Sequence, residues 1–322
     1  MNASPISSGC AAKIATRVAY GEALVEMGER FENLVVLDAD ITKAMQTGAF
    51  SKRYPERSVD FGIAEQDMMA AAAGMATMGK IPVVNTYAVF AALRACEQLR
   101  TFVAYPNLNV KIVVSHGGLA VGWDGVTHQG LEDMSVVRSI PNVAIVHPAD
   151  AVSTKKLLPQ ILAHEGPVYF RLGRNAVPVI YSEDHEFEMG RAEVLTDGRD
   201  VAIIACGLMV SESMKALDIL ASEGVRARLV DMHAIKPLDA AAVIEAAELT
   251  GAVVTVEDNN ILGGLGSAVA ETLGENCPTP MRRIGIRDCF GESGEPDALF
   301  EKYGMSAAHI ADAARQVIAL KK

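Results

Sequence analysis

Short, continuously apolar segments alternate with longer segments of helical periodicity along this sequence, and this alternation limits the possible folds more than any other feature. In the first half of the chain, strands are expected at residues 34–37, 81–85, 110–115, 143–147 and 168–172. Helices are expected at residues 16–30, 66–78, 91–104 and 151–164. Because strands that are apolar throughout must be buried on both faces, the pattern predicts an α/β fold in which helices cover a parallel sheet.

The alternation breaks between residues 173 and 200 and then resumes. The break contains Pro178, Gly190, Gly198 and a group of acidic residues at 183–188, which indicates a linker with an edge strand. After it, strands are expected at residues 201–205, 225–232, 252–257 and 281–286, and helices at 210–223, 239–250, 265–273 and 306–320. Since 322 residues suffice for two domains, we predict two parallel-sheet α/β domains, residues 1–190 and 191–322.

Charge and composition exclude several functional classes. The 29 basic and 40 acidic residues give a net charge of −11, which argues against a nucleic-acid partner because such a partner needs a basic face. The longest apolar stretch, residues 68–78, is too short to span a membrane, and the N-terminus lacks the pattern of a signal peptide. The five cysteines form no CxxC pair. We therefore expect free thiols, a cytoplasmic location, and neither a nucleic-acid nor a membrane partner.

Two segments at the ends of expected elements carry candidate binding residues. Glu65 lies where a loop enters the apolar helix at 66–78, so water would reach its carboxylate poorly. Taken alone, this segment favours the structural interpretation, an N-terminal helix glutamate that the helix dipole stabilises. Tyr87 and Phe90 follow the strand at 81–85 and could stack on a flat heterocycle or simply pack in the core.

A third segment, residues 117–130, is rich in glycine and carries Asp124, Thr127, His128 and the only tryptophan, Trp123. Glycine gives such a loop unusual backbone freedom. Long polar loops at strand ends of a parallel sheet are common binding positions. This segment therefore favours a functional interpretation over a structural one.

Taken together, these segments resemble the thiamine-diphosphate enzymes of the transketolase family. The resemblance rests first on GIAEQ at 62–66, TYAVF at 86–90 and SHGGLAVGWDGVTHQ at 115–129. It continues through FRLGRN at 170–175, VDMHAIKPLD at 230–239, VEDNNILGGLG at 256–266 and FGESG at 290–294. It covers nearly the whole chain after about residue 14 and implies the family's pyrimidine-binding domain followed by its C-terminal domain. The C-terminal domain matches no catalytic motif and is expected to serve structure or assembly.

One family motif is absent from the sequence. Family members bind the cofactor's diphosphate, through a divalent metal, with a GDG motif, and this chain contains no GDG. The resemblance therefore implies that thiamine diphosphate and Mg²⁺ are held mainly by a partner chain, an N-terminal transketolase subunit carrying that domain. An α2β2 heterotetramer is the expected assembly, this chain alone should be inactive, and none of its own residues is expected to bind the metal.

The resemblance also assigns roles to individual residues. Glu65 matches the catalytic glutamate that hydrogen-bonds N1′ of the cofactor's aminopyrimidine, and Tyr87 and Phe90 match the aromatic wall against that ring. The implied activity is transfer of a two-carbon ketol unit from a ketose to an aldose. His128 matches a proton shuttle or a ligand of a sugar hydroxyl.

Positions that contact a phosphosugar substrate are matched by His116, Asp124, His128 and Arg174. Arg174 would bind the phosphate, since guanidinium suits bidentate phosphate recognition, whereas Arg171 beside it is equally compatible with a structural role. The chain has Leu93 where most transketolases carry a third aromatic, and Trp123 where glutamate is common. The acceptor side is therefore expected to be reshaped, and the sugars are not specified by these motifs.

Three alternatives remain from the sequence. The first is the β subunit of a 2-oxo acid dehydrogenase E1 component, against which the DGVTHQ segment and His116 argue. The second is 1-deoxyxylulose-5-phosphate synthase, whose usual single long chain disagrees with 322 residues. The third is a degenerate subunit that regulates or assembles a full-length enzyme, which the presence of Glu65 and His128 disfavours.

Overall fold

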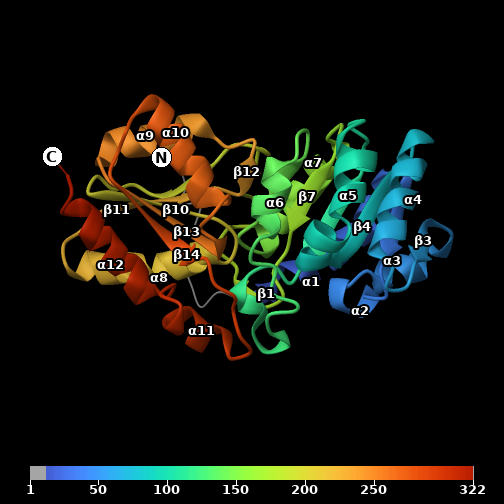
Figure 1. Cartoon of the computed structure of the whole chain (residues 1–322), viewed down its shortest axis with the longest axis horizontal. Coiled ribbons are helices and arrows are strands. Elements are labelled where there is room, and N and C mark those ends of the chain that lie inside the picture. Colours follow the sequence, from blue (N-terminus) through green and yellow to red (C-terminus); the bar gives the residue numbers. More distant parts are fainter. Residues whose placement is uncertain (1–11, 322) are drawn as a thin grey trace.

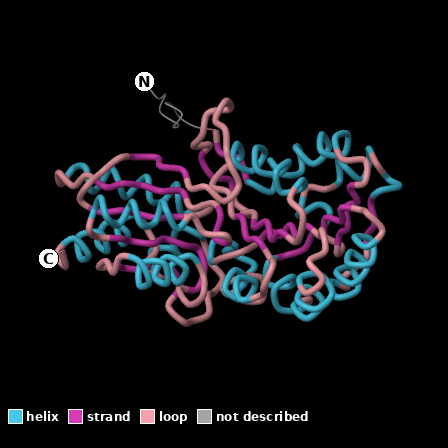
Figure 2. Tube along the Cα trace, turned by 90° about the horizontal axis from the view of Figure 1, so that it is seen from above, coloured by secondary structure: helices cyan, strands magenta, loops and turns pink. Residues whose placement is uncertain are grey.

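Two β-sheets lie side by side along the long axis of the molecule in the computed structural model, which describes residues 12–321 (Figure 1). The first sheet is built mainly from the blue-to-green half of the chain and the second from the yellow-to-red half. Helices lie on both sides of the strands in each half (Figure 2). The predicted fold class, two α/β units with mostly parallel sheets, is confirmed.

The first sheet has seven strands in the order β12-β6-β7-β5-β4-β2-β3. They are β2 (Leu34–Asp38), β3 (Ser58–Asp60), β4 (Ile81–Tyr87), β5 (Lys111–Ser115), β6 (Ala144–Val146), β7 (Val168–Arg171) and β12 (Ala234–Lys236). All neighbours are parallel except β12, which comes from the second half of the chain and pairs antiparallel with β6. The helices of this half are α1 (Thr16–Arg30), α2 (Thr42–Met45), α3 (Gly48–Arg53), α4 (Glu65–Thr77), α5 (Cys96–Gln98), α6 (Asp133–Ser139) and α7 (Ala151–Ala163). A separate two-stranded ribbon joins β1 (Lys13–Ala15) to β8 (Ala176–Pro178).

The second sheet has five strands in the order β14-β13-β10-β11-β9. They are β9 (Glu193–Thr196), β10 (Val201–Ala205), β11 (Ala227–Asp231), β13 (Val253–Asn260) and β14 (Met281–Ile286). The edge strand β9 is antiparallel to β11, and the other pairs are parallel. Its helices are α8 (Met209–Ser222), α9 (Ala240–Thr250), α10 (Leu265–Asn276), α11 (Pro296–Lys302) and α12 (Ala307–Ile318).

Strand β5 shows why the central strands read as continuous apolar runs. All five of its residues are buried, so each side chain, facing either way, must be apolar or internally satisfied. Its one cation, Lys111, donates from Nζ to the backbone carbonyl oxygens of His164 at 2.6 Å and Gly166 at 2.8 Å. Burial lowers the pKa of Lys111 to about 7. At its carboxyl end, β5 finishes at Ser115, and His116 follows directly.

Several elements differ from the sequence expectations, and three of them are informative. The segment expected as a single helix at 91–104 is the short α5 between two π-helical turns, Phe90–Arg94 and Leu99–Ala104. The sequence of this segment does not reveal these wider π-helical turns, because its apolar pattern suits an α-helical and a π-helical turn equally well. Strand β12 and helix α11 are short, and β12 forms only through pairing with the distant β6, so local sequence gives little signal for either.

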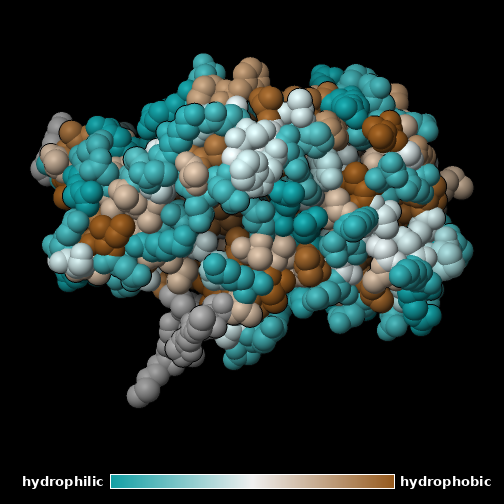
Figure 3. Space-filling view, turned by 90° about the horizontal axis from the view of Figure 1, so that it is seen from below, coloured by the Kyte–Doolittle hydropathy of each residue, from teal (hydrophilic) through white to brown (hydrophobic). Residues whose placement is uncertain are grey.

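None of the helices within residues 12–321 is both long and apolar enough to cross a bilayer. The four cysteines in this part of the chain, Cys96, Cys206, Cys277 and Cys289, are free thiols, and Cys10 lies outside the described residues. Polar side chains cover most of the face seen from below, with apolar patches between them (Figure 3).

Candidate active site at the carboxyl ends of the first sheet

The carboxyl ends of β2, β4 and β5 meet at one edge of the first sheet, because these strands are parallel neighbours. Tyr87 ends β4, and His116 follows β5 directly. Asp40 follows β2 after one intervening residue and has a positive φ of 56°. The fold therefore gathers at one edge polar residues that lie far apart in the sequence.

Four aromatic rings form a cluster at this edge. The ring centroid of Tyr87 lies 5.8 Å from that of Phe90, 4.1 Å from His116 and 5.7 Å from His128. His128 lies 5.5 Å from Phe90 in an edge-on arrangement. The structure thus brings together the two residues predicted for the aromatic wall and two predicted for the sugar.

His116 is held in a fixed orientation within this cluster. It is 3% exposed, it adopts a left-handed backbone conformation with φ of 59°, and its Nδ1 lies 2.7 Å from Ser115 Oγ. Burial lowers the pKa of His116 to about 3, and the positive charges of Arg17 and Arg174 contribute to this shift. The imidazole is therefore neutral at pH 7, with one nitrogen able to donate and the other able to accept a hydrogen bond.

Polar and charged side chains continue from this cluster into a cavity of about 410 Å³. Asp124 bridges its wall: Oδ2 lies 3.9 Å from His116 Nε2, and Oδ1 lies 3.5 Å from Arg174 Nη2. Arg17 and Lys43 also line the cavity. The cavity therefore presents three cations against two carboxylates, Asp40 and Asp124, and this excess of positive charge suits an anionic ligand although the whole chain is acidic.

Sequence reasoning missed Arg17 and Lys43. Arg17 lies in the helix expected at 16–30, where a polar residue ordinarily faces solvent. In the structure it donates from Nε to the carbonyl oxygen of Arg174 at 3.1 Å and from Nη1 to that of Ala44 at 2.7 Å. These bonds tie the start of α1 to α2 and to the FRLGRN segment. Two adjacent polar residues, Thr16 and Arg17, at the entry to this helix were the available signal.

The glycine-rich loop is fixed by a carboxylate from the second half of the chain. Asp258, on β13, accepts hydrogen bonds from the backbone N–H of Leu119 at 2.7 Å and of Ala120 at 3.2 Å. Gly118 makes this approach feasible: its φ is +89°, and a Cβ there would collide with the Asp258 carboxylate. The 3-10 turns at Leu119–Asp124, which carry Asp124, therefore start from a rigid anchor.

Arg171, which the sequence left open between two roles, lies in the interior rather than in the cavity. It is 1% exposed and pairs with the fully buried Asp133, with Nε 2.8 Å from Oδ2 and Nη2 3.1 Å from Oδ1. Its Nη2 also donates to the carbonyl oxygens of Gly130 at 3.1 Å and Asp258 at 3.0 Å. Arg171 therefore joins β7, α6, the glycine-rich loop and β13.

Glu65 is the first residue of α4 and is 2% exposed, as its position before an apolar helix suggested. Both of its carboxylate oxygens lie 2.8 Å from Nη1 of Arg94. The guanidinium carbon of Arg94 in turn lies 4.2 Å from the ring centroid of Phe90. Glu65 is thereby connected to the aromatic cluster through Arg94, a residue that sequence reasoning did not single out.

These residues fit the aminopyrimidine end of thiamine diphosphate. A buried carboxylate can hydrogen-bond a ring nitrogen, and the aromatic pair of Tyr87 and Phe90, connected to it through Arg94, can cover a flat heterocycle. Within the described residues, no group of three or more histidine, cysteine, aspartate or glutamate side chains is arranged to hold a metal ion. The buried carboxylate and the aromatic pair suit the pyrimidine part of the cofactor.

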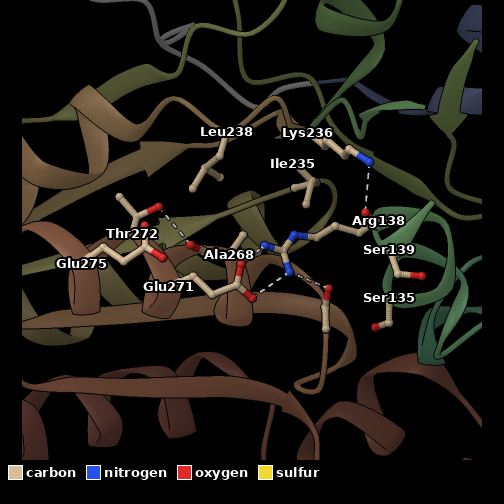
Figure 4. A pocket seen from close by; sticks show the side chains of 11 residues that line it. Ser135, Arg138, Ser139, Ile235, Lys236, Leu238, Ala268, Glu271, Thr272 and Glu275 are labelled. Atoms are coloured by element: carbon tan, nitrogen blue, oxygen red, sulfur yellow. Dashed lines mark hydrogen bonds and ion pairs between the residues drawn. The ribbon is translucent and has the colours of Figure 1, made fainter. Parts of the chain in front are cut away.

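A larger cavity, of about 540 Å³, lies where α6 faces β12 and α10 (Figure 4). Three of its four charged side chains, Arg138, Glu271 and Lys236, are engaged with one another or with backbone. Arg138 forms an ion pair with Glu271 and donates to the carbonyl oxygen of Gly263 at 3.3 Å. Lys236 donates to the carbonyl oxygens of Arg138 and Ile140. None of the predicted site residues lines this cavity, whose side chains instead hold the two halves of the chain together.

Two family models match successive parts of the chain. The model of the transketolase pyrimidine-binding domain matches residues 12–179, and that of the transketolase C-terminal domain matches residues 190–310. The chain is 46% identical to the 6-deoxy-6-sulfo-D-fructose transketolase subunit of Clostridium sp. (strain MSTE9), covering 94% of each protein. It is 40% identical to one of the subunits of the apulose-4-phosphate transketolase of Phocaeicola vulgatus, covering 95% of this chain and 98% of that protein.

A solved structure shows the same fold over nearly the whole chain. It is a split-gene transketolase described as an inactive β4 tetramer, with a TM-score of 0.90 and 48% sequence identity. The match covers 96% of the present chain and 100% of that one.

Proposed function

The chain belongs to the transketolase family, and we propose that it is one subunit of a split transketolase that transfers a two-carbon ketol unit from a ketose to an aldose. Thiamine diphosphate and Mg²⁺ would be held mainly by a second chain. The observation that carries the proposal is the convergence of the seven predicted site residues, directly or through Arg94, on one sheet edge of a chain that lacks a GDG motif. The chain also covers nearly the whole length of relatives that are themselves named as subunits, and this supports the split arrangement.

The cofactor's pyrimidine would be held by Glu65, Tyr87 and Phe90. When bound, thiamine diphosphate supplies a carbanion-like nucleophile and an electron sink for cleaving and forming the C–C bond. The Glu65 carboxyl would hydrogen-bond N1′ and hold or move a proton at that atom. Because Glu65 is 2% exposed, this hydrogen bond forms in a low-dielectric environment and is stronger than it would be in water.

The substrate would enter the cavity lined by His116, Asp124 and Arg174. Neutral His116, fixed at Nδ1 by Ser115, can hydrogen-bond a sugar hydroxyl through Nε2 without adding charge. His128, whose ring lies beside those of Phe90 and Tyr87, would exchange protons with oxygens of the substrate.

The cations that line this cavity suit a sugar with a terminal anionic group. Arg17, Lys43 and Arg174 all line it. The Clostridium and Phocaeicola relatives are named for sugars that carry a sulfonate or a phosphate, and either group is tetrahedral, anionic and well matched to guanidinium donors. We therefore infer a phosphosugar or sulfosugar donor for this enzyme.

The partner chain would cover apolar side chains next to the site. Ile63 is 75% exposed two positions before Glu65, and Trp123 is 61% exposed beside Asp124. Phe290 is 76% exposed and precedes Gly291, which lies against Gln129 of the glycine-rich loop. Exposed apolar residues of this kind at the rim of an incomplete site suit a protein interface. An α2β2 heterotetramer working in the cytoplasm is the assembly that we propose.

The proposal is tested by a ketol-transfer assay on this chain alone, on the diphosphate-binding chain of the same organism alone, and on the mixture. All three samples receive thiamine diphosphate, Mg²⁺ and a panel of neutral, phosphorylated and sulfonated ketoses and aldoses. Activity is expected only in the mixture, and only with the anionic sugars. Activity of this chain alone would refute the split arrangement.

Two variants sharpen the assay. Glu65→Gln should lower the activity of the mixture by at least about a hundredfold, because N1′ would lose its acid. Glu97→Gln, the same substitution at an exposed glutamate of α5, should leave it unchanged. Turnover of pyruvate in place of ketol transfer would favour the E1 β or deoxyxylulose-phosphate synthase alternatives. An inactive mixture that binds no cofactor would favour the degenerate subunit.

A further inference from the structure

Arg94 makes the two contacts that the cofactor's aminopyrimidine is expected to make. Its Nη1 lies 2.8 Å from both carboxylate oxygens of Glu65, and its guanidinium carbon lies 4.2 Å from the ring centroid of Phe90. The second distance is well within the range of a cation–π interaction. A guanidinium is planar, donates hydrogen bonds and stacks on aromatic rings, so it resembles an aminopyrimidine in each property that this site recognises.

The local backbone accounts for this placement. Phe90–Arg94 forms a π-helical turn, which closes with a hydrogen bond from the Ala95 N–H to the Phe90 carbonyl oxygen at 3.0 Å. Residues four apart in a helical segment lie on the same side, so Arg94 reaches back over the ring of Phe90. Widened turns of this kind are frequent at functional sites.

The two side chains of the Arg94–Glu65 ion pair differ strongly in solvent exposure. The Glu65 side chain is 2% exposed, whereas that of Arg94 is 44% exposed. Water does not reach the Glu65 carboxyl group without disturbing the start of α4, so this group needs a cation or another hydrogen-bonding partner beside it. The long Arg94 side chain can move into solvent at little cost, so it is the member of the pair that can leave.

We propose that Arg94 is a positioning residue that stands in for the aminopyrimidine: it holds Glu65 and covers Phe90 until the cofactor displaces it from both contacts. This inference rests on the proposed function, since it concerns the same pyrimidine site. Arg94 then has two separable effects. It stabilises the chain without cofactor, because it compensates a buried carboxylate, and it lowers the affinity for the cofactor, because it competes for the same contacts.

The first effect is measured on the isolated chain by thermal unfolding. Arg94→Met should lower the melting temperature by several degrees, because Glu65 is left charged and without its cation. The double variant Glu65→Gln with Arg94→Met should recover most of that loss, because no charge remains buried. Arg100→Met, at an exposed arginine later in the same segment, is the matched control and should have no effect. An unchanged melting temperature in Arg94→Met would overturn the inference.

The second effect is measured by titrating thiamine diphosphate, with Mg²⁺ present, into the complex with the diphosphate-binding chain and recording heats of binding. Arg94→Met should bind about tenfold more tightly than the unsubstituted complex, which corresponds to about 1.4 kcal/mol. Arg94→Lys, which keeps the charge but loses the planar group, should protect the melting temperature while giving an intermediate affinity. A purely structural arginine would not give tighter binding when removed.

The outcomes separate this inference from the proposed function. If the unsubstituted complex and Arg94→Met both fail to bind cofactor, the proposed function fails, and the stand-in role fails with it. If the unsubstituted complex binds and Arg94→Met binds equally or more weakly, the proposed function stands and the stand-in role is wrong.

Discussion

Replacing Arg171 with methionine should destabilise the chain by about 3–5 kcal/mol, the usual cost of removing one partner from a buried ion pair. The burial and hydrogen bonds of Arg171 explain this loss of stability. Arg171 is 1% exposed, and its removal leaves the fully buried Asp133 carboxylate with one remaining donor, the Tyr169 hydroxyl at 2.9 Å. It also leaves the carbonyl oxygens of Gly130 and Asp258 without their Arg171 Nη2 donor.

The companion variant Asp133→Asn separates the ion pair from the packing. Alone, it leaves the Arg171 cation buried without a counter-charge and should also cost several kcal/mol. The double variant is neutral at both positions, so its loss should fall short of the sum of the single losses by at least about 2 kcal/mol.

Urea unfolding at pH 7, followed by circular dichroism, measures all four proteins, with Arg199→Met at an exposed position as the control. A loss below about 1 kcal/mol in Arg171→Met, or full additivity in the double variant, would refute the argument that Arg171 and Asp133 form a coupled buried ion pair.

Three further predictions concern pH, backbone strain and substrate charge. Burial raises the pKa of Asp231 from 3.8 to about 8. Between these pH values the folded chain therefore binds more protons than the unfolded chain. The contribution of Asp231 to stability is accordingly full below about pH 4 and is lost as the pH rises to about 8. Thermal unfolding should therefore show Asp231→Asn gaining more stability over the natural chain at about pH 8.5 than at about pH 5; an equal difference at both would contradict this. Gly118→Ala should cost clearly more stability than Gly224→Ala, since both glycines have positive φ but only the first has a neighbour within 4 Å, and equal losses in urea would reject the steric argument. Arg17→Met in the active complex should raise the KM for anionic sugars at least about tenfold and change that for neutral sugars little; a uniform rise would assign Arg17 a purely structural role.

The sequence predicted the two parallel sheets because fully buried strands leave an unmistakable apolar run. It also identified the segments that meet at the sheet edge, since motifs near the carboxyl ends of parallel strands are brought together by the topology alone. It missed Arg17 and Arg94 for a common reason. Each lies in a helical segment whose polar residues are ordinarily assigned to solvent, and only the tertiary contacts, to Arg174 in one case and Glu65 in the other, reveal which way it points.

For a related reason, the sequence did not predict strand β12 and did not decide between the two possible roles of Arg171. A three-residue strand has no periodicity to detect, and its pairing with β6 is a property of the assembled halves. Arg171 stands three positions before Arg174, and nothing in the local letters separates an arginine that neutralises a buried aspartate from one that faces a cavity.

The carboxylate of Asp258 has a consequence for how this chain can be recombined with its relatives. The loop that carries Asp124 belongs to the first half of the sequence, yet Leu119 and Ala120 are fastened by a side chain that arrives more than a hundred residues later. A chimera spliced at the linker would inherit the loop from one parent and its fastening from the other. The segment 117–125 and strand β13 must therefore be exchanged as a unit, and the second half of the chain fixes the loop that carries Asp124 without lining the cavity itself.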